Sequence, residues 1–154
     1  EKNSDLPFEE VDLYEMAEDV VQHLESAAKK KNITVSLDGS LVMVNGVRHV
    51  IYEMLFNIAD NAIRYTDPKG TVKISLGMRG EHPYYCVEDN GIGIAEDEQK
   101  RIFERFYRVD KSHSRATGGT GLGLSIVKHG AILHNAQIKL ESEPGKGTKM
   151  ELMF

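Results

Sequence analysis

A long helix with one narrow polar stripe is the feature that most constrains what this chain can fold into. In segment 47–66, apolar residues recur at helical spacing over about five turns. At about 100° per residue, the polar residues gather on a single stripe, made of Glu53, Asn57, Asp60, Asn61 and Arg64. The helix is apolar nearly all round, so the stripe is either a narrow solvated face or a ligand-binding face.

The asparagines of the stripe weaken the interpretation as a solvated face. Asparagine is a mediocre helix former, and an ordinary solvated stripe would hold Glu, Lys or Gln at lower cost. Asn57 and Asn61 stand one turn apart and offer carbonyl oxygens in a row. Such oxygens suit a hard cation or a polar ligand. Both interpretations stay open on this segment alone.

Composition limits the class of protein. The 154 residues are enough for one domain with a real core, and 40% hydrophobic and 28% charged residues are globular values. A net charge of −5 argues against general nucleic-acid binding, which needs a basic face. The single cysteine, Cys86, lies in an apolar segment. We expect a buried, inert thiol and a chain compatible with the cytoplasm.

The ends of the chain indicate a piece of a longer protein. No run approaches the roughly 18 apolar residues of a membrane span, and no signal peptide is present. The first residue is Glu1 and not an initiator methionine. We therefore expect residues 1–154 to be a single domain cut from a longer parent.

The periodicity predicts helices and strands in irregular alternation. Asp12 with Glu15 resembles a capping box that opens a helix to about Lys31. Further helices are expected at 47–66, 95–103 and 122–134, and strands at 33–37, 41–44, 71–77, 84–88, 137–142 and 148–154. This order predicts an α/β sandwich (α+β), a mixed and mostly antiparallel sheet with helices on one face.

A first loop motif follows the strand at 84–88. It reads DNGIGI, from Asp89 to Ile94. It is a good turn sequence, and a plain turn is one interpretation. In the other, Asp89 at the strand end faces a pocket and accepts a hydrogen bond from a base such as an adenine amino group. The two glycines would then let the backbone approach a ligand closely.

A second loop motif, GGTGLGLS, enters the helix at 122–134. Backbone N–H groups at a helix N-terminus bind anions, which favours a phosphate site. The loop lacks the lysine of a P-loop and the spacing of a dinucleotide fingerprint. Residues 100–115 before it carry six Lys and Arg against Glu104 and Asp110. This asymmetry indicates anionic contact, with a solvated loop as the ordinary alternative.

Four segments together resemble a known family. EMLFNIADNAIRYT, DNGIGI, IFERFYRVDK and GGTGLGLSIVKHG are similar to the N, G1, F and G2 boxes of sensor histidine kinases. These enzymes belong to the Bergerat-type ATP-binding superfamily, with gyrase B, mismatch-repair and heat-shock chaperone ATPases. The resemblance runs from about Val11 to Phe154. It implies the Bergerat ATP-binding fold, with ATP and Mg²⁺ as cofactors.

The resemblance implies a role for each matching residue of the N and G1 boxes. Asn61 would ligate the Mg²⁺ bound to the triphosphate, and Asn57 would support the phosphates or the metal shell. Arg64 would contact phosphate, and Tyr65 would pack against the adenine. Asp89 would accept from the adenine amino group, beside a wall formed by Gly91, Gly93 and Ile94.

The F and G2 boxes would close over the phosphates. Phe103 and Phe106 would hold the base of an ATP lid, and Arg105 and Arg108 are candidate phosphate contacts. The glycine loop would form a hinge beside the phosphates, with Gly119, Thr120, Gly121, Leu122, Gly123 and Leu124. Residues from about 108 to 118 are expected to be poorly ordered until nucleotide binds.

The catalytic candidates are Asn57, Asn61 and Glu53. In hydrolytic relatives, the residue one turn before the metal-binding asparagine is commonly a glutamate that activates water. Asn57 stands there and cannot take a proton at neutral pH. Glu53 lies about 12 Å of helix rise from Asn61, too far to take the role unaided. The pattern therefore favours a kinase over a hydrolase.

The phosphoacceptor of the family is missing, because none of the six histidines lies in a motif like HExRTP. The resemblance therefore implies a kinase domain that phosphorylates a histidine on a separate dimerisation domain, which then serves a response regulator. Its parent would be a homodimer anchored at the cytoplasmic side of a bacterial membrane, and the fragment a monomer that binds no nucleic acid. The alternatives are an ATP hydrolase or conformational clamp of the same fold, and a degenerate domain that only binds partners.

Overall fold

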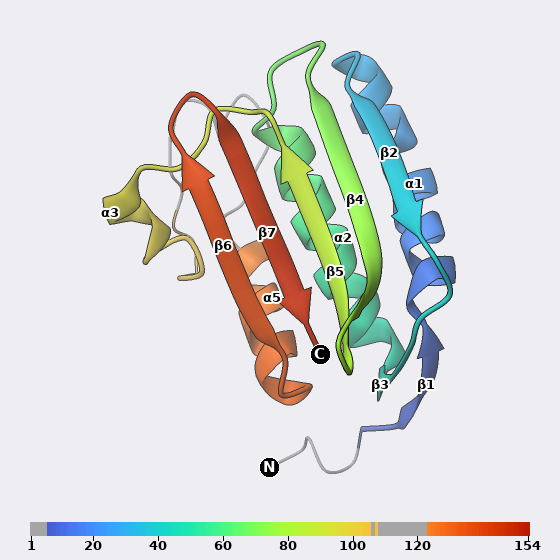
Figure 1. Cartoon of the computed structure of the whole chain (residues 1–154). Coiled ribbons are helices and arrows are strands. Elements are labelled where there is room, and N and C mark those ends of the chain that lie inside the picture. The colour runs from blue at the N-terminus through green and yellow to red at the C-terminus, as the bar shows by residue number, and fades with distance from the viewer. Residues whose placement is uncertain (1–5, 106, 108–122) are drawn as a thin grey trace.

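The computed structural model describes residues 6–105, 107 and 123–154. Its elements alternate as the periodicity predicts (Figure 1). In chain order they are β1 (Phe8–Asp12), α1 (Leu13–Lys30), β2 (Thr34–Gly39), β3 (Met43–Val47), α2 (Arg48–Arg64), β4 (Thr71–Arg79), β5 (His82–Asp89), α3 (Glu96–Gln99), α5 (Gly123–Leu133), β6 (Gln137–Glu143) and β7 (Gly147–Met153).

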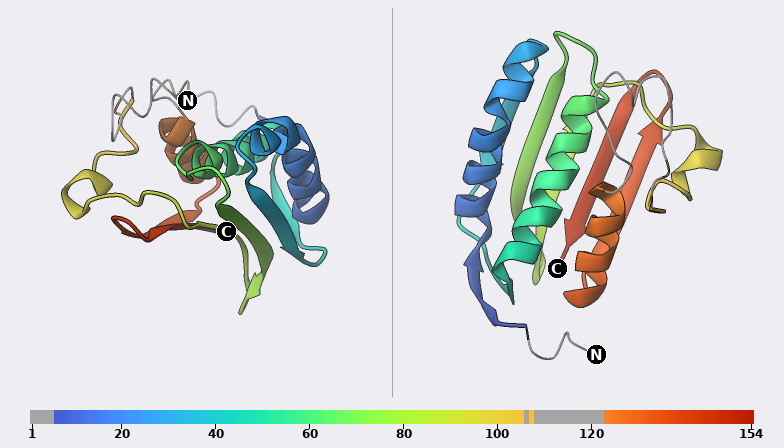
Figure 2. Two further views of the ribbon diagram at one scale, coloured as in Figure 1. Left: turned by 90° about the horizontal axis from the view of Figure 1, so that it is seen from above. Right: turned by 180° about the vertical axis from the view of Figure 1, so that it is seen from behind.

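Five strands form one mixed sheet in the order β2-β4-β5-β7-β6. The β2–β4 pair is parallel, and the other three pairs are antiparallel. Helices α1, α2 and α5 lie side by side on one face of this sheet, and no helix of the described residues covers the other face (Figure 2). Strands β1 and β3 form a separate two-stranded antiparallel sheet. The predicted α/β sandwich, with a mostly antiparallel sheet and helices on one face, is confirmed.

The core lies between the sheet and the helix layer. Alternate residues of β4, β5 and β7 point inward, as the period of two requires: Val72, Ile74, Leu76, Tyr85, Val87, Met150 and Leu152 are all buried. Tyr85 donates its hydroxyl to the carbonyl oxygen of Leu55 in α2 over 2.9 Å. Burial raises the pKa of this hydroxyl, so it stays a donor. Central helix α2 is thereby fixed to the middle of the sheet.

The opposite face of the sheet is polar and charged. One row crosses four strands with alternating charge, Lys73 beside Glu88, Glu88 beside Lys149, and Lys149 beside Glu141. Opposite charges on neighbouring strands stabilise a sheet modestly. Glu151 on the same face pairs with Arg79 through two contacts of 2.8 and 3.1 Å.

Both long helices begin with side-chain acceptors. Asp12 caps α1 as predicted, because its Oδ1 accepts from the amides of Tyr14 and Glu15 at 3.0 and 3.1 Å. Helix α2 has no cap of its own at Val47. Instead His134, just after α5, accepts from the Val47 amide at Nε2 over 3.0 Å. Its Nδ1 lies 2.8 Å from the Gly130 carbonyl and must donate, which makes this a neutral structural histidine.

Three details differ from the sequence-based expectation. Strand β1, which is not among the strands predicted from the sequence, pairs with β3. Helix α3 covers only Glu96–Gln99 and not 95–103, because turns replace the helix from Lys100 onward. Helix α2 spans Arg48–Arg64, slightly less than 47–66. Within the described residues, every helix lacks the length or the apolar character that a bilayer span needs.

Candidate nucleotide site

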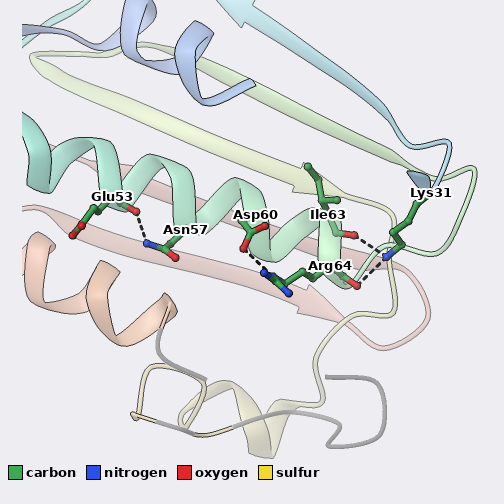
Figure 3. Close-up of polar contacts among 6 residues, drawn as sticks. All are labelled: Lys31, Glu53, Asn57, Asp60, Ile63 and Arg64. Atoms are coloured by element: carbon green, nitrogen blue, oxygen red, sulfur yellow. Dashed lines mark hydrogen bonds and ion pairs between the residues drawn. The ribbon is translucent and has the colours of Figure 1, made fainter. Parts of the chain in front are cut away.

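The polar stripe of α2 lies along the helix side that faces the start of α5 and the α3 region (Figure 3). Its side chains are partly ordered by neighbours on the same helix. Arg64 Nε donates to Asp60 Oδ2 over 2.8 Å, one turn back. Asn57 Nδ2 donates to the main-chain oxygen of Glu53 over 2.7 Å. The predicted stripe is therefore present and half-buried at Asn57, Asn61 and Arg64.

The orientation of Asn57 is set from two sides. Because its Nδ2 is engaged by the Glu53 carbonyl, its Oδ1 is directed elsewhere. A Cβ placed on Gly123 would come within 2.9 Å of that oxygen. The first residue of α5 thus lies directly against the amide of Asn57, and a side chain at Gly123 would displace that amide. The structure brings the N and G2 boxes together at this contact.

Asn61 and Glu53 differ in what surrounds them. Among the described residues the carboxamide of Asn61 makes no hydrogen bond, so its oxygen can still accept a ligand. An amide oxygen is a suitable ligand for Mg²⁺. Glu53 is exposed, and it is one of the residues at a groove between α1 and α2, with Asp19 and Tyr52. The hydrogen bond between Glu53 and Asn57 is made by the main-chain oxygen of Glu53.

Asp89 ends β5 on the inward side of the sheet. Its Oδ1 accepts from the amides of Gly91, at 2.8 Å, and Thr148, at 3.2 Å. Burial raises the pKa of this carboxyl to about 6, the two amides oppose the rise, and Glu88 adds to it. Near neutral pH the group is a carboxylate held by one oxygen. Among the described residues no donor reaches Oδ2, which leaves an acceptor for a ligand.

The two glycines of the G1 box are required by close backbone contacts. A Cβ on Gly91 would lie 2.1 Å from the carbonyl oxygen of Tyr65, and one on Gly93 would lie 2.1 Å from that of Glu143. Gly93 also has φ of +75°, a left-handed conformation that other residues adopt at a cost. The loop after β5 is therefore pressed between the end of α2 and the β6–β7 turn.

Tyr65 and Ile94 frame this loop. Tyr65 follows α2, and its carbonyl accepts from the Ile92 amide over 3.0 Å. Ile94 is 7% exposed, and its amide donates to Ser142 Oγ over 2.8 Å. Ser142 and Thr148 were not selected from the sequence. Strand β7 places Thr148 opposite Asp89 of β5, and β6 places Ser142 opposite Thr148. The register of strands cannot be predicted from a single sequence.

The F box is described only in part. Phe103 packs against the core, and Tyr107 bonds Glu98 through its hydroxyl while Arg101 lies over its ring at 4.4 Å. Arg105 is exposed. Leu124, 9% exposed, belongs to the core and not to an open surface. Several predicted site residues, and the segment expected to form a lid, lie outside the described residues: Phe106, Arg108, Gly119, Thr120, Gly121 and Leu122.

The arrangement suits a purine nucleotide. A carboxylate oxygen, two close-packed glycines and a tyrosine stand at one end, and a row of amides leads along α2 to the first residue of α5. The model of the histidine kinase-, DNA gyrase B- and HSP90-like ATPase family matches residues 46–154. The chain belongs to this family. The resemblance of the sequence to the ATP-binding catalytic domain of sensor histidine kinases is thereby confirmed.

Comparison with individual proteins also finds histidine kinases. The sensor-like histidine kinase SenX3 of Mycolicibacterium smegmatis is 45% identical over 144 residues, covering 92% of this chain and 37% of SenX3. The catalytic domain of histidine kinase ThkA superposes with a TM-score of 0.84 at 27% identity, over 97% of this chain and 95% of that one. Full-length ShkA in complex with AMPPNP superposes with a TM-score of 0.81 at 26% identity, over 96% of this chain and 31% of ShkA. The chain thus spans well under half the length of its full-length relatives.

Proposed function

We propose that this domain binds Mg·ATP and donates the γ-phosphoryl group to a histidine on a separate domain of its parent protein. The observation that carries the nucleotide part is Asp89. Its Oδ1 is held by two backbone amides while its second oxygen has no donor among the described residues. This fixed acceptor suits the exocyclic amino group of adenine. Gly91, Gly93, Ile94 and Tyr65 would line the base.

The phosphates would lie along the stripe of α2. Asn61 would offer its amide oxygen, which accepts no hydrogen bond from the described residues, as a ligand for Mg²⁺. Asn57 lies one turn away, and Arg64 would contact phosphate. Bound Mg²⁺ would neutralise charge on the triphosphate. Arg105, Arg108 and the loop from Gly119 to Leu124 would complete the site from the other side. Gly123 already contacts Asn57, which supports this assignment.

The chain's own groups favour transfer over hydrolysis. Hydrolysis requires a base that activates water, and the amide of Asn57 has no such capacity. Its nitrogen is also engaged by the Glu53 carbonyl, and Glu53 is exposed about two turns of α2 away from Asn61. The attacking group would therefore come from outside. An ATP hydrolase or clamp of the same fold is the alternative, and it requires an added base.

The same proposal covers the parent protein. We infer a single domain from a longer homodimeric kinase at the cytoplasmic side of a bacterial membrane, with a histidine-bearing dimerisation domain as its direct partner. A response regulator would take the phosphoryl group from that partner. The fragment alone would be monomeric. Support comes from the names of the relatives, which are sensor kinases, and from the short share of them that this chain spans.

Calorimetric titration with ATP, with and without Mg²⁺, tests the site. Asn61→Ala is expected to abolish the Mg²⁺-dependent part of the affinity, because it removes the amide oxygen assigned to the metal. Asn45→Ala, an exposed position in β3, serves as the matched control and should bind as the unchanged chain does. An unaltered affinity for Asn61→Ala in Mg²⁺ buffer would refute the metal assignment.

A further inference from the structure

Lys31 joins the end of α1 to the end of α2 and lies outside the N, G1, F and G2 boxes. Its half-buried side chain crosses to the last turn of α2, where Nζ donates to the carbonyl oxygens of Ile63, at 2.9 Å, and Arg64, at 3.0 Å (Figure 3). The last four carbonyls of a helix have no partner within the helix. Lys31 supplies donors to two of them.

The charge of Lys31 suits this place. The C-terminal end of a helix carries a partial negative charge, which a nearby cation stabilises. Burial lowers the pKa of Lys31, nearby Asp67 opposes this, and Arg64 adds to the lowering. The main chain of Lys31 is engaged as well, because its carbonyl accepts from the Lys69 amide over 2.9 Å. Lys31 therefore fixes both the end of α2 and the turn that follows it.

The fixed turn is the one that carries the nucleotide contacts. Arg64 and Tyr65 are the residues assigned to phosphate and adenine, and they immediately follow the clamped carbonyl of Ile63. The Tyr65 carbonyl in turn accepts from the Ile92 amide, and Gly91 packs against it. A continuous set of hydrogen bonds thus leads from Lys31 through the end of α2 to the loop after Asp89.

We propose that Lys31 is a positioning residue of the nucleotide site, which holds the last turn of α2 against the loop after β5 so that Arg64 and Tyr65 meet the ligand in a fixed geometry. This inference rests on the proposed function. Lys31 touches no nucleotide and acts only through the backbone of α2. Its effect would come from alignment, because it holds the groups that meet the ligand in a fixed orientation.

The test compares variants by titration with Mg·ATP at a temperature well below unfolding. Lys31→Met keeps the apolar stem and removes the donors, and we expect about tenfold weaker binding, or about 1.4 kcal/mol. Lys31→Arg, which can also donate to two carbonyls, should recover most of the affinity. Lys31→Gln, with one amide donor, is the second variant if the methionine protein does not fold. Lys30→Met, exposed on the same helix end, should bind normally.

A stability-matched control separates positioning from simple destabilisation. Glu151→Gln weakens the ion pair with Arg79 on the open face of the sheet, so it should lower Tm without changing affinity. In Lys31→Met, the amide resonance of Ile92 should shift, because its acceptor on Tyr65 moves, and in Glu151→Gln it should not. A Lys31→Met protein with lower Tm but unchanged affinity and unchanged Ile92 resonance would overturn the proposal.

One further arm distinguishes failure of this inference from failure of the site itself. Tyr65→Ala is titrated in parallel. If Tyr65→Ala loses affinity and Lys31→Met does not, only the positioning role is wrong. If Tyr65→Ala also binds Mg·ATP as the unchanged chain does, the nucleotide assignment at the end of α2 is wrong, and the role of Lys31 is wrong with it.

Discussion

Replacing Asp89 by asparagine should separate nucleotide recognition from folding. The asparagine Oδ1 can keep the two hydrogen bonds from the amides of Gly91 and Thr148, so the loop should keep its shape. The second carboxylate oxygen becomes an NH₂ group, which presents a donor to the donor of adenine. A charge-assisted hydrogen bond contributes about 1.5–3 kcal/mol, which corresponds to about 10- to 150-fold in affinity.

Calorimetry with two nucleotides measures this loss. ATP should bind Asp89→Asn about 10- to 150-fold more weakly than it binds the unchanged chain. Inosine triphosphate carries a carbonyl in place of the amino group, so the new NH₂ can donate to it and its affinity should not fall. Equal losses for the two nucleotides would refute the assignment of Asp89 to the adenine amino group.

The same substitution should stabilise the nucleotide-free domain. Burial raises the pKa of Asp89 from its ordinary 3.8 to about 6. Ionisation at neutral pH therefore costs the folded state up to about 3 kcal/mol, an amount that a neutral asparagine avoids. Below pH 6 the folded carboxyl takes a proton while the unfolded one stays ionised. The unchanged chain thus gains stability relative to the variant as pH falls from 7 toward 4.

Urea unfolding at several pH values provides the assay. The variant should be the more stable protein at pH 7, and the difference should shrink between pH 7 and pH 5. A variant that is less stable at pH 7, by an amount independent of pH, would show that Asp89 does not sit in a desolvating site. The carboxylate that binds adenine would then not lower the stability of the nucleotide-free domain.

Two further predictions concern single side chains. Gly123→Ala should weaken Mg·ATP binding about fivefold or more, the equivalent of about 1 kcal/mol, because its Cβ would meet Asn57 Oδ1 at 2.9 Å. His129→Ala, exposed in the same helix, is the control, and equal affinities for the two variants would contradict the contact. Cys86 is buried, and burial raises its pKa to about 11, so a thiol reagent should label it only after denaturation. Rapid labelling of the folded chain would show that this face of the sheet opens.

The sequence predicted the site through the residues that have local causes. The stripe of α2 follows from helical periodicity, and Asp89 with its glycines follows from a strand end and a turn. The structure contains both features where the local pattern predicts them, and their role in binding nucleotide stays a prediction. The helix cap at Asp12 was equally local, because its acceptor and donors lie within three residues.

The parts that were missed depend on contacts between distant segments. Thr148 reaches Asp89 through strand register, His134 caps a helix that begins 86 positions earlier at Arg48, and Lys31 lies 32 positions from Ile63. The local sequence around each of these residues does not predict which distant residue it contacts. The helix predicted at 95–103 was too long, because the acidic first turn of α3 is a good helix start. After Gln99 the chain forms turns, and Ile102 and Phe103 pack on the core there.

Phosphoryl transfer tests the central claim most directly. The isolated chain is incubated with Mg·ATP labelled at the γ-phosphate, alone and with the histidine-bearing domain of its parent. Alone, it should hydrolyse ATP far more slowly than ordinary enzymes, which turn over on the order of once per second or more, and should not label itself. With the added domain, an acid-labile phosphohistidine should appear on that domain. Steady hydrolysis by the chain alone, or label on any of its own six histidines, would contradict the account.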